Sequence, residues 1–385
     1  MNRLIKHHEG ARHHNRIFDA VFAFVKKNIV LCIAAVAAAV SAVIVPPDAE
    51  YLGYFDVKTL TCLFCVLAVV CALKNINFFY ILACEIVRRF KNIRLSILAL
   101  VYITFIGSML IANDMALLTF LPLGYFVLST TKNEKHMAFT FIMQNIAANL
   151  GGMLTPFGNP QNLYLYTKFS IPTGEFVMIM LLPFCLAIAL ITLCCIVFVK
   201  PEPLTVEGER EPIDRKKAII LGALFALSIA IVFRGIPYWV GLIVIPVALF
   251  FIDKKALGDV DYPLLLTFVA FFIFSGNVSR IEAVRVAVGS LLDRSTLLVS
   301  TLSCQLISNV PSAILLSNFT DNYRELLVGV NIGGAGTLIA SLASLITFKE
   351  YMRHNPGGAS SYIKKFSAFN FAFLGIMLVV MTVVM

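Results

Sequence analysis

The chain has 385 residues, of which 59% are apolar and only 14% charged, and its mean hydropathy is +0.87. This composition excludes an ordinary soluble globular domain, in which about 25% of residues are charged. The formal net charge of +9 would suit a nucleic-acid partner in a soluble protein. The basic residues instead follow a membrane pattern, so no nucleic-acid binding is expected.

Apolar runs dominate the chain from its first span onward. Residues 1–28 form a basic N-terminal tail. A charged segment of this length is long for the start of a secretory signal, so the apolar run at 29–45 is predicted to be an uncleaved first span. Later runs approach or reach the ~20 residues that cross a bilayer as a helix: 60–73, 95–112, 176–199, 218–233 and 366–385. The prediction is an all-α polytopic membrane protein with about 10–12 membrane segments in the cell membrane.

The orientation follows from the loops. With a cytoplasmic N-terminus, the segments assigned to the inside carry 24 of the 31 Lys and Arg residues. Short loops rich in these residues stay in the cytoplasm. The net charge is therefore interpreted as a topology signal, and the N-terminus is expected inside.

A hydrophilic stretch at 200–217 divides the chain into a first half, 29–199, and a second half, 218–385. Each half contains a polar tip between two apolar arms, followed by a helix interrupted by glycines. The likeness lies in the order of these features, not in residue identity. On the charge-based topology the two hairpins open to opposite sides, which predicts two inverted repeats, each with a re-entrant hairpin and a broken transmembrane helix.

In the first half, the expected hairpin tip lies near 113–114 and the helix break at 155–162. Asp114 is the one acidic residue of 22 that lies within apolar sequence. A carboxylate inside a membrane is costly unless it is paired, ion-bound or protonated, so Asp114 is a candidate coupling residue, with a capped or protonated structural Asp as the alternative. The charge rule leaves open whether 95–128 is one hairpin or two full spans.

In the second half, the expected tip lies at 308–312 and the weaker break at 333–337. Unwound backbone in a bilayer survives where it lines a cavity or is covered by protein, and its helix ends attract ions. A kink that only shapes packing is the alternative at each break. The candidate substrate- and ion-binding residues are Asn113, Asp114, Thr155, Gly158, Asn159, Pro160, Gln161, Asn162, Ser308, Asn309, Pro311, Ser312 and Thr337.

Three segments resemble a known family. IANDMALLTFLPLGYFVL (111–128) resembles the arsenite-permease pattern in which Asn-Asp opens the second arm of the first hairpin. TPFGNPQNLYL (155–165) resembles a Gly-Thr-Pro-Pro-Asn type of break, and SNVPSAILLSN (308–318) a Ser-Asn-Thr tip. These are features of the ion transporter superfamily of arsenite permeases, related sodium/proton antiporters, citrate transporters and divalent-anion sodium symporters, and the likeness spans roughly 60–345.

The resemblance implies that the substrate and ion sites lie between a scaffold domain and a moving transport domain, lined by Asn113, Asp114, Asn159, Asn162, Ser308, Asn309 and Thr337. The candidate sodium position is near Asn113, Asn159, Ser308 and Asn309. A homodimer is expected by the same resemblance. The first tip reads Asn113-Asp114-Met115 where the dicarboxylate branch has Ser-Asn-Thr, and Val310-Pro311 follows the second Asn, which argues against a dicarboxylate.

These features predict a secondary transporter of a small anion, an inorganic oxyanion or a small carboxylate, driven by H⁺ or Na⁺ through alternating access, with no other cofactor. A sodium/proton antiporter and a passive channel are the alternatives of the transport class. A membrane-embedded enzyme would need an H-E-x-x-H, aspartate-rich or G-x-S-x-G motif, and the sequence contains none of these, so no enzymatic activity is expected.

Overall fold

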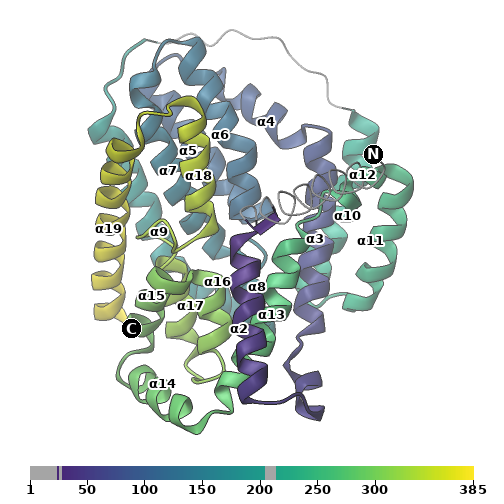
Figure 1. The fold of residues 1–385 in the computed structure, drawn as a ribbon. Helices are drawn as coiled ribbons and strands as arrows, with labels where there is room; N and C mark the ends of the chain where they lie inside the picture. Colours follow the sequence, from purple (N-terminus) through teal and green to yellow (C-terminus); the bar gives the residue numbers. More distant parts are fainter. Residues whose placement is uncertain (1–23, 26–27, 204–213) are drawn as a thin grey trace, which may run out of the picture. The chain divides into compact units, whose positions relative to one another are not determined.

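The computed structural model describes residues 24–25, 28–203 and 214–385, and within these ranges it is built from helices without a strand (Figure 1). Most of the predicted tail 1–28 and of the loop 200–217 lies outside the described residues. Five stretches within them are long and apolar enough to cross a membrane: α3 (Val57–Asn75), α5 (Ile93–Ile111), α9 (Thr173–Phe198), α19 (Ala359–Val384) and Lys254–Ser279, which combines α12 and α13. The predicted all-α polytopic fold is confirmed.

The chain divides into two compact units. Unit 1 comprises residues 1–55 and 261–281, and its described helices are α2 (Ile29–Ile44), η1 (Ala49–Tyr54) and α13 (Tyr262–Ser279). Buried Asn277 on α13 joins the three, since its Nδ2 donates to Ser41 Oγ at 3.1 Å and to the Tyr51 hydroxyl at 2.7 Å. These units do not coincide with the two halves expected from the sequence.

Unit 2 holds both predicted hairpins and both predicted breaks. Its first part contains α3, α4 (Phe78–Val87), α5, α6 (Asn113–Thr130), η2 (Glu134–His136), α7 (Met137–Gly151), η3 (Gly152–Leu154), α8 (Pro160–Lys168) and α9. Its second part contains α10 (Arg215–Val232), α11 (Tyr238–Ile252), α12 (Lys254–Gly258), α14 (Glu282–Arg294), α15 (Thr296–Ile307), α16 (Asn309–Leu316), α17 (Tyr323–Ile332), α18 (Leu342–His354) and α19.

A single residue turns the chain at each hairpin tip. Ala112 joins α5 to α6 with φ 64° and ψ 152°, and Ser308 joins α15 to α16 with φ 75° and ψ 160°. A positive φ in a residue other than glycine costs of order 1–3 kcal/mol and persists only where the surroundings enforce it. The two tips therefore share one strained geometry, which ties the two hairpins together as structural equivalents.

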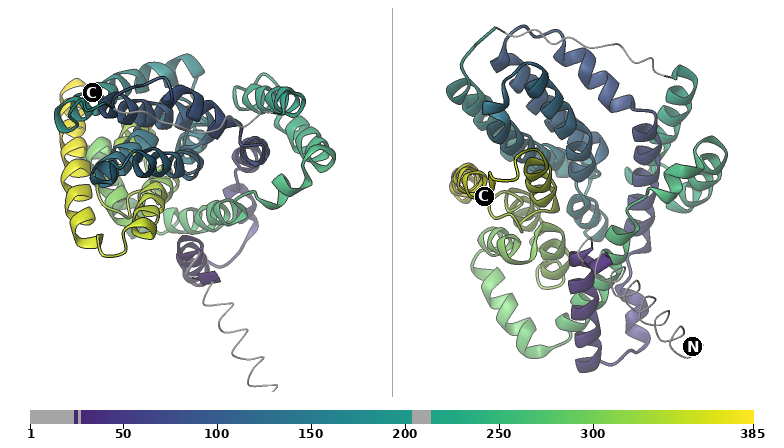
Figure 2. Two further views of the ribbon diagram at one scale, coloured as in Figure 1. Left: turned by 90° about the horizontal axis from the view of Figure 1, so that it is seen from above. Right: turned by 45° about the horizontal axis from the view of Figure 1, so that its top comes forward.

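The two hairpins occupy opposite parts of unit 2. In Figure 1 and in the right panel of Figure 2, α5, α6 and α7 lie in one half of the unit and α14, α15 and α17 in the other. Helices α15 and α16 have 12 and 8 residues, or about 18 and 12 Å, far short of the ~30 Å hydrocarbon core. The second hairpin is thus re-entrant, and the repeats are inverted.

Each hairpin is followed by an interrupted helix. The first break comprises residues 152–159, between α7 and α8, and the second comprises residues 333–341, between α17 and α18. Pro160 occupies the first helical position of α8, where its missing N–H is tolerated. Pro160, Gln161 and Asn162 accordingly lie in the first turn of α8, after the break. The second break extends four residues beyond Thr337.

Candidate functional site

The tip of the first hairpin is bonded to the helix that precedes the first break. Asn113, the first residue of α6, donates from its Nδ2 to Asn149 Oδ1 on α7 at 3.2 Å. Ser341, the last residue of the second break, donates from its hydroxyl to the same oxygen at 2.8 Å. Asn149 therefore connects the first hairpin to the second break.

The tip of the second hairpin reaches the same place. The backbone N–H of Asn309, the first residue of α16, donates to the Ala340 carbonyl in the second break at 3.0 Å. A Cβ placed on Gly334 would lie 3.2 Å from Asn309 Nδ2 and 3.7 Å from Asn149 Oδ1. Both tips thus end beside Gly334.

Asn331, the residue before the last of α17, connects the second half to the first break. Its Oδ1 accepts from Asn159 Nδ2 at 3.2 Å and from Gln161 Nε2 at 3.4 Å. Its Nδ2 donates to Asn162 Oδ1 at 2.6 Å and to the Leu327 carbonyl at 2.8 Å. Asn331 is 1% exposed, so these bonds form in an enclosed polar centre.

In each repeat a threonine of the break forms a hydrogen bond to the hairpin of the same repeat. Thr155 Oγ1 donates to the Met109 carbonyl on α5 at 2.8 Å, and Thr337 Oγ1 donates to the Gln305 carbonyl on α15 at 3.1 Å. Met109 and Gln305 lie three residues before the respective tips. Each break therefore packs against the first arm of the hairpin from its own repeat.

The two breaks also share sequence. Residues 149–155 read NLGGMLT and residues 331–337 read NIGGAGT, which are identical at the Asn, both glycines and the Thr. The expectation that the halves are alike only in the order of their features is wrong at this segment. Counting on from the shared pattern, Asn159 and Ser341 are equivalent, and each binds the Asn of the opposite repeat: Asn159 binds Asn331, and Ser341 binds Asn149.

Glycines permit the close approach of these helices. A Cβ on Gly151 would meet Ser108 Oγ at 2.7 Å and the Phe105 carbonyl, both on α5. A Cβ on Gly333 would meet Cys304 Sγ at 2.9 Å on α15. Small residues at helix crossings allow such backbone contact in membranes. The shared glycines thus set the position of each break against its hairpin.

Comparison with known proteins identifies the family. A model of the citrate transporter (CitMHS) family matches residues 18–323. The chain belongs to the citrate transporter family. The uncharacterized transporter MJ0456 of Methanocaldococcus jannaschii is 32% identical over 296 residues, 76% of this chain and 80% of that protein. The inner membrane protein YbiR of Escherichia coli K12 is 29% identical over 281 residues, 71% of this chain and 74% of that protein.

The fold has a solved counterpart. The crystal structure of the Alcanivorax borkumensis YdaH transporter, described there as having an unusual topology, covers 87% of each chain with a TM-score of 0.58 and 13% identity. At this identity the likeness concerns the fold alone. Together these findings make the chain a multi-pass membrane transporter of the superfamily expected from its motifs, and not an enzyme.

Four helix N-termini of this citrate transporter family member converge at the centre: those of α6, α8, α16 and α18. The N-cap residues of the first three, Ala112, Asn159 and Ser308, give no side-chain hydrogen bond to their own helix. Ser341 caps α18 through the Ala343 N–H at 3.3 Å. Helix N-termini carry about half a positive charge, which suits an anion.

Two amide oxygens at the centre are available to a cation. Asn159 Oδ1 and Gln161 Oε1 are buried and accept no hydrogen bond from the described part of the chain. An unsatisfied buried oxygen is costly, and oxygen atoms of this kind are the ligands that hard cations such as Na⁺ take. Both side chains donate to Asn331 Oδ1, so the two free oxygens belong to adjacent groups.

The structure places most of the predicted site residues around this centre: Asn113, Thr155, Gly158, Asn159, Pro160, Gln161, Asn162, Ser308, Asn309 and Thr337. Gly158 lies against Gly152 and Thr155, and a Cβ on Gly158 would be 2.6 Å from Thr155 Oγ1. Ser312 lies apart from the amide network, since its hydroxyl pairs with Ser303 on α15 at 2.9 Å. Pro311 lies beside it in the first turn of α16.

Asp114 lies next to the centre in the first turn of α6 and is half-buried. Its backbone N–H donates to Asn113 Oδ1 at 3.0 Å. Leu118, one turn further on the same helix face, lines a 180 Å³ cavity together with Thr119 and Lys74. Asp114 thus lies beside the amide network, one helical turn from a residue that lines this cavity.

Four residues of the centre are missing from the site predicted from sequence. They are Asn149, Asn331, Ser341 and Gln305. Gln305 bridges the second break, because its Nε2 donates to the Gly333 and Ala335 carbonyls at 2.8 and 3.2 Å. Its Oε1 accepts the Thr337 N–H at 2.9 Å. Aligning the two halves on their Gly-Gly pairs would have identified Asn149, Asn331 and the position of Ser341.

Proposed function

We propose that this chain is a secondary active transporter that moves a small anion, an inorganic oxyanion or a small carboxylate, by alternating access coupled to H⁺ or Na⁺. The observation that carries the proposal is the meeting of two hairpin tips and two helix breaks around Asn149 and Asn331. In secondary transporters, substrates and coupling ions bind at such interrupted helices near the bilayer midplane.

The chemistry of the centre supports an anion together with a cation. The partial positive charge of the four helix N-termini favours an anion, while Asn159 Oδ1 and Gln161 Oε1 offer oxygen atoms to Na⁺. The proposed sodium position includes Asn113, Asn159, Ser308 and Asn309 as well. Citrate, the substrate in the family's description, is the first anion to test.

Asp114 is the proposed coupling residue. It is the ionisable side chain beside the first tip, in the first turn of α6. Proton coupling would use protonation of this carboxylate, and sodium coupling would use it as an ion ligand. If Asp114→Asn leaves gradient-driven uptake unchanged, Asp114 is not the coupling site.

The orientation is proposed from charge. Loops predicted to be cytoplasmic are joined within unit 2, since Lys135 pairs with Glu202 at 2.9 Å and the Ile93 N–H donates to the Glu202 carbonyl at 2.9 Å. Loops predicted to be external are joined in the same way, by Arg324 and Glu175 at 2.7 Å. Labelling of single engineered cysteines in these loops in intact cells would test the cytoplasmic N-terminus. The homodimer rests on the resemblance alone, and native mass spectrometry would test it.

Proteoliposome uptake tests the proposed function. Purified protein would be given inward H⁺ or Na⁺ gradients with citrate, other small carboxylates and oxyanions outside. We expect one gradient to drive accumulation of one of these anions, and Asn113→Ala with Asn309→Ala to abolish it. Asn370→Ala is the matched control, because Asn370 is a fully buried asparagine on α19 whose Nδ2, among the residues that the structure describes, bonds only within its own helix.

Three results would overturn the proposal. If no anion accumulates under either gradient while the protein stays folded, coupled anion transport is wrong. If the protein exchanges Na⁺ for H⁺ with no anion present, the sodium/proton antiporter of the same superfamily replaces it. Anion flux that persists without either gradient would indicate a passive channel.

A further inference from the structure

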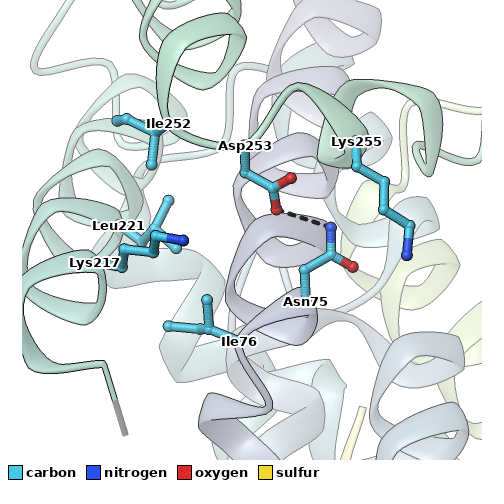
Figure 3. A pocket seen from close by; sticks show the side chains of 7 residues that line it. All are labelled: Asn75, Ile76, Lys217, Leu221, Ile252, Asp253 and Lys255. Carbon is cyan, nitrogen blue, oxygen red and sulfur yellow. Dashed lines mark hydrogen bonds between the residues drawn. The ribbon is translucent and has the colours of Figure 1, made fainter.

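A second cavity of 260 Å³ lies in unit 2 away from the amide centre, where the ends of α3, α10, α11 and α12 meet (Figure 3). Its polar lining consists of Lys217, Lys255, Asp253 and Asn75, and its apolar lining of Ile76, Leu221 and Ile252. Ligand pockets for drug-sized molecules have about 300–1,000 Å³, so this cavity suits a smaller group. Transport chemistry at the centre uses none of these residues.

The charges of this cavity favour a singly charged anion. Asp253 is held by Asn75, whose Nδ2 donates to Asp253 Oδ2 at 2.8 Å (Figure 3) and to Asp259 Oδ2 at 3.3 Å. Neither Lys217 nor Lys255 forms an ion pair with another described residue. Two lysines and one aspartate leave the lining with a net charge of +1. A phosphodiester carries one negative charge, whereas a phosphate monoester carries about −1.5 to −2 at pH 7.

The position of the cavity matches the head-group level of a bilayer. Ile219 on α10 is 73% exposed and Phe251 on α11 is 80% exposed, so both helices present apolar side chains to lipid within a turn of the cavity. The adjacent Lys254 places its Nζ 5.0 Å above the Phe250 ring, an arrangement in which a long basic side chain bridges apolar surface and polar head groups. The lysines therefore lie where the hydrocarbon ends.

We propose that this cavity binds the head group of an anionic phospholipid such as phosphatidylglycerol. Lys217 and Lys255 pair with the phosphodiester, and the glycerol and the start of the acyl chains lie against Ile76, Leu221 and Ile252. Basic pockets between membrane helices bind anionic head groups in this way. The site goes beyond the proposed transport function, since it would bind a structural lipid and not the transported anion.

Native mass spectrometry of the full chain tests this site. Purified protein in detergent would be titrated with dioleoyl-phosphatidylglycerol, dioleoyl-phosphatidylcholine and inorganic phosphate. We expect phosphatidylglycerol to bind more tightly than phosphatidylcholine, and K217Q/K255Q to weaken it roughly 30-fold, because each lysine near an anionic lipid contributes a factor of about 5. K364Q/K365Q is the matched control, which removes the same charge from two adjacent exposed lysines of α19 outside the lining and should leave binding unchanged.

Three outcomes would overturn the proposal. Equal loss in both double variants would indicate diffuse surface charge, and equal binding of the two lipids would remove the head-group preference. Displacement of phosphatidylglycerol by inorganic phosphate at comparable concentration would make this a site for free anions. All four lysines are exposed, so the variants are expected to fold, and a thermal unfolding scan of each would verify that.

Discussion

Asn331 is the residue at which a single substitution should most disturb the centre. Asn331→Leu keeps the branched shape of the side chain, with larger terminal groups, and removes four hydrogen bonds: to Asn159, Gln161, Asn162 and the Leu327 carbonyl. Asn159 retains a bond to the Asn149 carbonyl at 3.2 Å. Gln161 Nε2 and Asn162 Oδ1 lose the one hydrogen bond that each forms within the described residues.

The expected loss in the free energy of unfolding follows from these bonds. Side-chain hydrogen bonds between membrane helices contribute on average about 0.6 kcal/mol each, since the unfolded chain in a membrane also finds partners. A buried polar atom left unsatisfied costs about 1–3 kcal/mol in soluble proteins, and the lower end applies here for the same reason. Four lost bonds and two unsatisfied atoms together give about 4 kcal/mol. With an unfolding entropy of about 2.1 cal/mol/K per residue, this corresponds to a fall in Tm of roughly 5 °C.

The assay is thermal unfolding in detergent with a thiol-reactive dye. Cys62, Cys65, Cys71, Cys195 and Cys304 are buried free cysteines and become reactive on unfolding. The matched control is Asn370→Leu, which removes an equally buried asparagine with one bond, to the Phe366 carbonyl at 2.9 Å. If Asn370→Leu lowers Tm as much as Asn331→Leu does, the bonds of the centre do not stabilise it as argued.

Three further substitutions test the packing of α17 against α15, the hydrogen bonds that hold the second break, and the ion pair between Lys135 and Glu202. Gly329→Ala should lower the free energy of unfolding by about 1–3 kcal/mol, because the new Cβ would lie 2.9 Å from a backbone carbonyl of α15. Gly375→Ala is the control: with open space around the glycine, it should leave the free energy of unfolding unchanged or raise it slightly. Gln305→Met should raise hydrogen exchange in the second break and leave the first break unchanged, since three bonds to the break backbone are lost. The hydrogen bond from Lys135 lowers the pKa of Glu202 in the folded protein below its ordinary 4.5. The small stabilisation by this pair is therefore present above pH 4.5, and it is lost as the pH falls through the pKa that Glu202 has in the folded protein. The Tm difference between wild type and Glu202→Gln should therefore shrink toward zero in acid, and a difference that grows in acid would refute the assignment.

The sequence predicts the fold well because the membrane imposes strong constraints. Apolar length identifies the spans, Lys and Arg counts predict orientation, and polar residues within apolar sequence identify the tips. The tips lie within a residue or two of the expected positions, at Ala112 and Ser308. Helix ends are less predictable. Asn162, expected in the break, lies in α8, where it donates to the Gly152, Met153 and Thr155 carbonyls and so binds the break from the adjacent helix.

The site is only partly predictable, because four of its hydrogen bonds join the two repeats. Asn149 and Asn331 lie within helices, where an isolated buried Asn has no local signal of function. Their importance comes from Ser341 and Asn159, each supplied by the opposite repeat. Only the equivalence of NLGGMLT and NIGGAGT would reveal these pairs from sequence, since it assigns each residue of one break a counterpart in the other.

The two repeats differ at two pairs of equivalent positions, and these differences indicate that the repeats have different roles in transport. Asp114 follows the first-tip Asn, whereas Val310 follows the second-tip Asn, so the carboxylate is present in one hairpin and absent from the other. Gln305, which bridges the second break, has Met109 as its counterpart, and a Met side chain cannot replace its amide bonds. The second break is thus held to its hairpin by more bonds than the first. We therefore expect ion coupling to depend on the first repeat, so that Val310→Asp should not restore gradient-driven uptake to Asp114→Asn; restored uptake would show that the two tips are interchangeable.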